Sequence, residues 1–128
     1  MKYSIIIIMF LIVSCSKKEE VVKDKNLLGF KSTFLAEFGD DKFDGLRNKT
    51  EEKPVVKYVD DVIFVTLYAQ MNACDRYEGM VEVKNDSIIL GYKSLTDEAC
   101  TSTVIDKLSY IVDNPAKKKN YKVLFNLK

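Results

Sequence analysis

The segment Pro54–Gln70 reads PVVKYVDDVIFVTLYAQ and predicts the central part of a β-sheet. It is made of short runs of β-branched and aromatic residues, the composition typical of strands. Two such runs, Val55–Val59 and Val62–Gln70, flank Asp60-Asp61, which predicts a hairpin turn. Because Val62–Val65 is apolar on both faces, we expect the second run to be the central and most buried strand of a sheet.

β-Branched and aromatic residues also predominate toward the C-terminus, in further short runs separated by residues typical of turns. Asn85-Asp86 is a good hairpin signal, since both residues tolerate the positive φ of two-residue turns. The strands predicted in this part of the chain are Met80–Lys84, Ser87–Tyr92, Ile105–Val112 and a closing strand in which Tyr121, Val123, Phe125 and Leu127 alternate with mostly polar residues. The pattern indicates an antiparallel meander of about six strands.

The segment before this region shows a different spacing. Leu27, Phe30, Phe34 and Phe38 recur at the intervals of one stripe of an amphipathic helix. This spacing predicts one N-terminal helix that packs on the sheet. The fold class is therefore α+β and mainly β, and the sequence leaves open whether the strands form an open sheet, a small barrel or a sandwich.

Between this helix and Pro54 lies a stretch that imitates a calcium loop. Its ligand positions are matched in part by Asp40, Asp44, Asn48 and Glu51. Lys42 occupies a position that should supply an oxygen ligand, and Pro54 falls where the following helix should form. We therefore expect a surface loop here and no metal site.

The N-terminus carries the pattern of a targeting segment. Lys2 is followed by nine apolar residues, Ile5–Val13, and by Ser14 and Cys15. Nine residues are too few for a membrane-spanning helix, which needs about 20. Ile12-Val13-Ser14-Cys15 resembles the lipobox of bacterial lipoproteins. The resemblance implies that residues 1–14 are a cleaved signal peptide and that Cys15 carries a diacylglycerol thioether and an acylated amino group.

The following residues, 15–26, lack a periodic apolar face and are expected to form a lipidated, flexible tether before a single β-rich domain, 27–128. Ser16-Lys17-Lys18-Glu19-Glu20 resembles the export signals of surface-exposed lipoproteins. This resemblance implies an envelope protein bound to the membrane by its lipid, in the outer membrane and exposed at the cell surface.

Two further cysteines, Cys74 and Cys100, remain for this small domain. In an oxidising compartment we expect a disulfide between them, with two free thiols or a shared metal site as the alternatives. Closing this loop stabilises the fold by about 3.5 kcal/mol in the chain-entropy model.

Charge and composition exclude some functions. Without residues 1–14 the chain has 19 basic and 19 acidic side chains, and this balance argues against a nucleic-acid partner. The chain contains no histidine, which removes the usual nucleophile–histidine pairs and histidine metal ligands. No cofactor motif is present, so we expect none to be bound.

The residues around the expected disulfide are the best candidates for a binding surface. Asp75, Arg76 and Tyr77 follow Cys74, and Asp97 and Glu98 precede Cys100. Loops held by a disulfide and carrying such side chains suit partner recognition. A second candidate is the Lys117–Lys119 turn, which suits anionic headgroups or polysaccharide.

We therefore expect a non-catalytic binding domain whose partner is an envelope protein or a polysaccharide. One alternative is an envelope enzyme in which Glu78 or Glu98 converges with Tyr77 or Tyr92 in a pocket. Another is a structural subunit of an envelope assembly.

Overall fold

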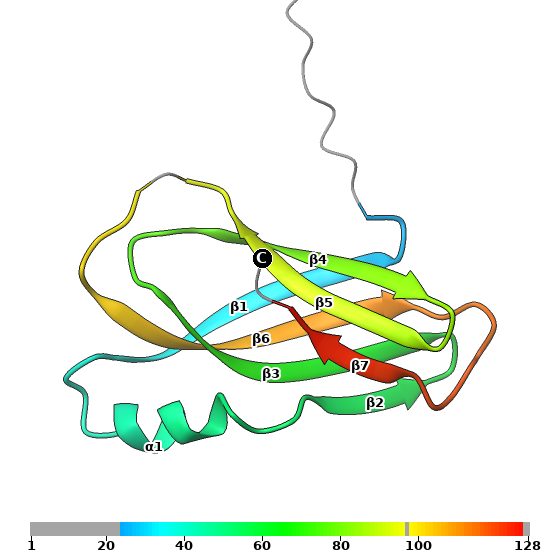
Figure 1. Cartoon of the computed structure of the whole chain (residues 1–128), viewed down its shortest axis with the longest axis horizontal. Helices are drawn as coiled ribbons and strands as arrows, with labels where there is room; N and C mark the ends of the chain where they lie inside the picture. Colours follow the sequence, from blue (N-terminus) through cyan, green and yellow to red (C-terminus); the bar gives the residue numbers. More distant parts are fainter. Residues whose placement is uncertain (1–23, 97, 127–128) are drawn as a thin grey trace, which may run out of the picture.

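The computed structural model describes residues 24–96 and 98–126 of the chain (Figure 1). Cys15 and the expected signal peptide lie outside these residues, as does the expected tether up to residue 23. Within these residues the fold is mainly β with one helix, and the mainly β class agrees with the prediction from the sequence. Its strands are β1 Leu27–Glu37, β2 Val55–Val59, β3 Val62–Asn72, β4 Tyr77–Lys84, β5 Ser87–Ser94, β6 Thr103–Asp113 and β7 Lys122–Phe125, and the helix is α1 Phe43–Lys49.

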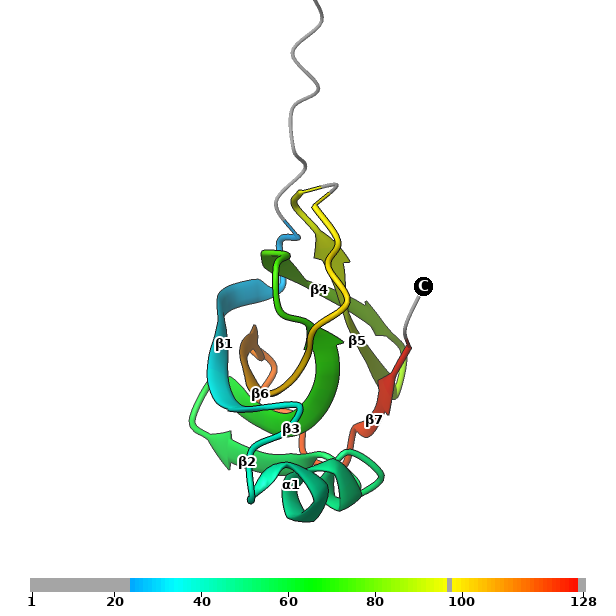
Figure 2. The same ribbon diagram turned by 90° about the vertical axis from the view of Figure 1, so that its left-hand side faces the viewer.

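The strands form two sheets that pack face to face as a sandwich (Figure 2). One sheet has the order β1-β6-β3-β2 and the other the order β4-β5-β7. Their facing side chains make one core, which includes Val65 and Tyr110 from the first sheet and Ile88 and Leu90 from the second. All pairs are antiparallel except β5 with β7, which is parallel, so the chain departs from a simple meander at its last strand.

Strand β3 is central, as predicted, because it pairs along its whole length with β6 and over its first half with β2. Its alternate residues Ile63–Met71 are buried in the sandwich core. The opposite face is less buried than expected, since Phe64 keeps 37% of its surface exposed. Asp60 and Asn85 adopt φ of 50° and 49°, which confirms the two predicted hairpin turns.

The helix predicted from the spacing of Leu27, Phe30, Phe34 and Phe38 is wrong, because these residues belong to strand β1 and the turn after it. Pairing of β1 with β6 is interrupted by register shifts between Leu27 and Gly29 and between Phe34 and Ala36. A bulge of this kind brings residues an odd number apart onto one face. Leu27 and Phe30 thus both pack on the core, although they are three residues apart.

The one helix, α1, lies instead in the segment expected to be a surface loop. Phe43 is its buried residue and packs with Ala36 and Ile105 on the outer face of the four-stranded sheet. Phe38 meets Phe43 edge to face at 5.5 Å between ring centroids. No helix within the described residues is long and apolar enough to cross a membrane.

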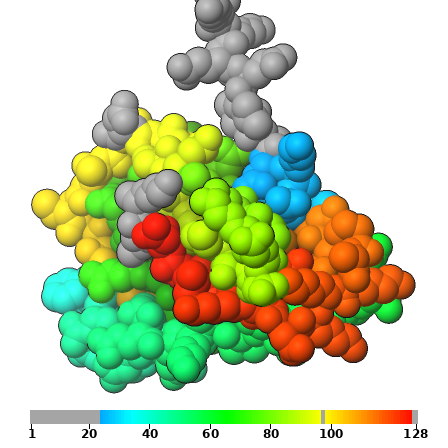
Figure 3. All heavy atoms as spheres, turned by 45° about the vertical axis from the view of Figure 1, so that its right-hand side comes forward, coloured from blue at the N-terminus to red at the C-terminus, as the bar shows by residue number. Residues whose placement is uncertain are grey.

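The sandwich has two distinct ends, which position the candidate sites (Figures 1 and 3). We call one the Asp24 end, where β1 begins and Leu27 pairs with Val112. The turn 114–120 lies beside it, and the N–H of Asp113 donates to the carbonyl of Asn26. The other is the staple end, where Asn72 pairs with Thr103 and where the loops carrying Cys74 and Cys100 lie.

Candidate functional site

The predicted disulfide is present at the staple end. Cys74 and Cys100 are bonded, with their Cα atoms 5.7 Å apart. Asn72 joins the same loops: its Oδ1 accepts the N–H of Cys74 at 3.0 Å and that of Cys100 at 3.3 Å, and its Nδ2 donates to the Cys100 carbonyl at 2.6 Å. A covalent bond and one amide side chain thus hold both loops together.

Asp75 connects these loops and is not free to bind a partner. Its carboxylate accepts hydrogen bonds from the hydroxyl of Thr96 at 2.6 Å and from the Thr96 N–H at 3.3 Å. Hydrogen bonds from the side chains of Ser94 and Thr96 lower the pKa of Asp75. The carboxylate therefore stays ionised and acts within the loop structure.

Tyr77 points into the sandwich and is likewise structural. Its hydroxyl accepts the Asn72 N–H at 3.0 Å, and its ring packs edge to face on Tyr92 at 5.0 Å. Burial raises the pKa of Tyr77 above its usual value. Glu78 is the next residue of β4, so it points to the opposite face, where it pairs with Lys93 at 3.1 Å. The structure does not bring Glu78 together with Tyr77 and Tyr92.

Arg76 and Glu98 are exposed and accessible at the staple end. Within residues 24–96 and 98–126 the Arg76 side chain forms no ion pair. Leu95, which is 55% exposed, is bonded to the same loop because its N–H donates to the Arg76 carbonyl at 2.8 Å. We call Arg76, Leu95 and Glu98 the staple surface. Asp97, the remaining predicted binding residue, lies outside the described residues.

Sequence reasoning missed Asp106, a carboxylate on the core face of β6. The hydroxyl of Ser32 donates to its Oδ2, while its Oδ1 is buried and has no hydrogen-bond partner among the described residues. Because residues two apart in a strand share a face, the expected position of Leu108 on the core face would have placed Asp106 there as well. An unsatisfied buried acceptor costs about 1–3 kcal/mol, so this half-buried carboxylate is unusual beside the apolar core.

A second candidate site is a groove between β1 and β4, each of which is one of the two edge strands of its sheet. Here the two strands border a hollow of about 740 Å³. Leu28, Met80 and Leu95 line it and are 53%, 41% and 55% exposed. We call this the edge groove. It is an apolar concavity of the size that commonly binds small ligands or peptide segments.

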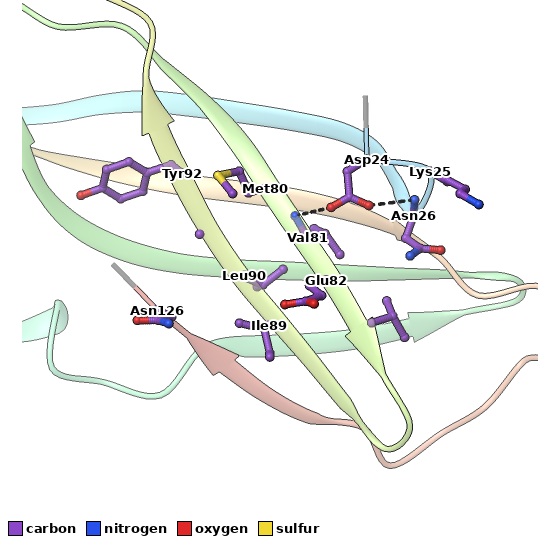
Figure 4. A pocket seen from close by; sticks show the side chains of 12 residues that line it. Asp24, Lys25, Asn26, Met80, Val81, Glu82, Ile89, Leu90, Tyr92 and Asn126 are labelled. Carbon is purple, nitrogen blue, oxygen red and sulfur yellow. Dashed lines mark hydrogen bonds between the residues drawn. The ribbon is translucent and has the colours of Figure 1, made fainter. Parts of the chain in front are cut away.

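Asp24 stands where the edge groove meets a second hollow of about 680 Å³ on the outer face of β4 and β5 (Figure 4). One of its carboxylate oxygens accepts the Val81 N–H at 2.9 Å, and the other accepts the Asn26 N–H at 3.2 Å. Gly91 lies in this second hollow, and a Cβ added there would be 2.9 Å from the carbonyl oxygen of Asn126.

In the stretch that resembles a calcium loop, Asp40 and Asp44 have separate partners. Asp40 accepts the N–H of Glu37 at 2.8 Å, and Asp44 pairs with Arg47 at 3.5 Å within α1. Asn48 and Glu51 are exposed. The described part of the chain contains no group of three or more His, Cys, Asp or Glu side chains placed to hold a metal ion.

The Lys117–Lys119 turn lies at the Asp24 end, opposite the staple surface. The ammonium of Lys118 is paired with Asp86 and lies 4.9 Å from the centre of the Tyr121 ring. The hydrogen bond from this ammonium to Asp86 raises the pKa of Lys118. This contact fastens the turn to the β4–β5 hairpin and leaves Lys117 and Lys119 exposed.

Comparison of the chain with protein-family models, with curated proteins and with solved structures finds no match.

Proposed function

We propose that this protein is an envelope lipoprotein, anchored through lipid on Cys15, whose domain binds a partner protein without catalysis. The sequence around Cys15 supports the anchor, and the lipid would be attached nine residues before Asp24. In the proposed state the outer membrane lies on the side of the Asp24 end. The staple surface then faces away from the membrane.

The observation that carries this proposal is the position of the staple surface, at the opposite end of the sandwich from Asp24. Arg76 and Glu98 are exposed there on loops that a disulfide and Asn72 hold in place. Pre-organised loops lose little conformational entropy on binding, which favours recognition. Arg is also enriched in protein interfaces and among their energetically dominant residues.

The test is capture of a partner from native envelopes with the lipidated chain, followed by chemical cross-linking. The double variant Arg76→Glu/Glu98→Lys reverses both charges and should lose the cross-linked partner. Lys122→Glu, an exposed substitution on β7 that lies outside both candidate surfaces, serves as the matched control and should retain it. Equal capture by the natural chain, the double variant and the control would contradict binding at the staple surface. Recovery of polysaccharide alone would show that the partner is a polysaccharide and not a protein.

A specific observation favours a second function, that of a subunit in an envelope assembly. Val55, Val59 and Phe64 share the outer face of the four-stranded sheet and are 55%, 47% and 37% exposed. Exposed apolar clusters of this kind often mark contacts with other proteins. Under this alternative Val55→Lys, and not the staple variant, would abolish capture.

A further inference from the structure

The outer face of the three-stranded sheet carries a long depression over β4 and β5. Helix α1 packs on the other sheet, against β1, β3 and β6. The edge groove and the second hollow, shown in Figure 4, both have Asp24 and Met80 among their lining residues, so the two adjoin over Met80. We call the edge groove and the second hollow together the outer trough.

The pairing of β4 with β5 connects the outer trough to the staple surface. The Leu95 N–H donates to the Arg76 carbonyl at 2.8 Å, one pair beyond the last pair of the β4–β5 ladder. Because side chains two apart in a strand share a face, Arg76 lies on the same face as Glu78 and Met80. Leu95 belongs to the staple surface and also lines the edge groove. The staple surface and the outer trough are therefore one continuous surface.

The floor of the outer trough is closed by the contact between the two sheets. Phe30 packs against Gly79, where an added Cβ would lie 2.4 Å from its ring, and so fills the space between β1 and β4. A molecule in the outer trough must therefore lie on top of the outer face. There it meets Met80 and Leu95, whose side chains are 41% and 55% exposed.

The charges along the outer trough indicate the chemistry of a molecule that fits it. Three acidic side chains of this surface have partners within the fold: Asp24, Glu78 and Glu82. Arg76 forms no ion pair within the part of the chain that the structure describes. A guanidinium next to apolar surface binds a carboxylate through charge-assisted hydrogen bonds. The outer trough thus suits a segment in which apolar side chains stand next to an acidic residue.

We propose that the partner protein places an extended segment in the outer trough, with apolar side chains over Met80 and Leu95 and a carboxylate against Arg76. This inference rests on the proposed function, because the partner is the one that binds the staple surface. It adds the chemistry of the bound segment and its course from the staple surface toward Asp24. Four strand steps separate Arg76 from Met80, a length of about 13 Å, which about five extended residues cover.

Photo-cross-linking in native envelopes tests this course. The lipidated full chain carries p-benzoylphenylalanine in place of one exposed residue: Leu28 in the edge groove, Ala99 beside the staple surface, or Lys122 on β7 as the control. We expect one partner protein to be cross-linked from positions 28 and 99 and not from position 122. The cross-linked peptide should contain an acidic residue within about five residues of an aliphatic or aromatic one.

The possible results separate this inference from the proposed function. A partner protein cross-linked from position 99 and not from position 28 would overturn the outer trough and leave the proposed function intact. A partner cross-linked from position 28 alone would contradict the continuous course from the staple surface. Cross-linking from neither position, or to polysaccharide alone, would contradict both the inference and the proposed function.

A substitution in the outer trough gives a second test. Met80→Asp should weaken capture of the partner at least about tenfold, because it removes an apolar contact and repels the incoming carboxylate. Leu124→Asp is the matched control: Leu124 is 39% exposed and Met80 41%, and Leu124 lies on the outer face of the same sheet but lines neither hollow. Circular dichroism verifies that both variants fold. Equal capture by the two variants would contradict binding in the outer trough.

Discussion

At the scale of single residues, Gly79 shows how closely the two sheets approach. A Cβ on Gly79 would lie 2.4 Å from the ring of Phe30, whereas a Cβ on Gly45 in α1 would meet nothing within 4 Å. Gly79→Ala should therefore destabilise the fold by about 1–3 kcal/mol, as overpacking does. Gly45→Ala, the control, should stabilise it by about 0.5–1 kcal/mol through helix propensity. Urea unfolding of both variants measures the difference, and equal effects would contradict the Phe30–Gly79 contact.

The lowered pKa of Asp75 predicts how the stability of the fold depends on pH. Its pKa is lowered below 3.8 by the hydrogen bonds from Ser94 and Thr96, so the ionised form favours the folded state. The stabilisation is present above pH 3.8 and is lost as the pH falls through the folded pKa. Asp75→Asn should thus be less stable than the natural chain at neutral pH, and the gap should narrow in strong acid. A gap that is independent of pH would show that the carboxylate charge is irrelevant.

Single residues also mark the limits of sequence reasoning about the site. The disulfide follows from counting cysteines, but the roles of Asp75 and Tyr77 do not, because they depend on Thr96 and Asn72 across a loop and a strand end. Both side chains were expected to face a partner and instead hold the structure together. Arg76 and Glu98 have the expected exposure, and within the described residues neither forms an ion pair.

At the scale of elements, strand β1 explains the main difference between the expected and the observed fold. Strands with strict alternation, such as β2, are predictable because residues two apart share a face. In β1 two register shifts break that rule and imitate helical spacing. The helix α1 was missed for the opposite reason: its seven residues contain one buried apolar side chain, Phe43, which is too little for a periodic signal.

The disulfide at the staple end leads to a prediction about the free energy of unfolding. The disulfide closes a loop with a sequence separation of 26, so Cys74→Ser/Cys100→Ser should lower the free energy of unfolding by about 3.5 kcal/mol. Denaturant unfolding measures this loss. Titration of the denatured, unreduced domain should detect no thiol at Cys74 or Cys100 in the natural chain, and two reactive thiols there would refute the bond in the natural protein.

At the scale of the whole molecule, the edge groove joins the two ends of the sandwich. Asp24 lines the groove at one end, and Leu95, which belongs to the staple surface, lines it at the other. The sequence predicts the β-rich class from its strand runs. It does not predict the two-sheet order, since the pairing of β1 with β6 and of β5 with β7 joins segments far apart in the chain.

The lipid anchor can be tested by the intact mass of the protein extracted from its native membranes. We expect a chain that lacks residues 1–14 and carries a diacylglycerol group and a third acyl chain on Cys15. Cys15→Ser is the control and should yield no lipidated species. A natural protein that retains residues 1–14, or that has an unmodified Cys15 thiol, would contradict the lipid anchor.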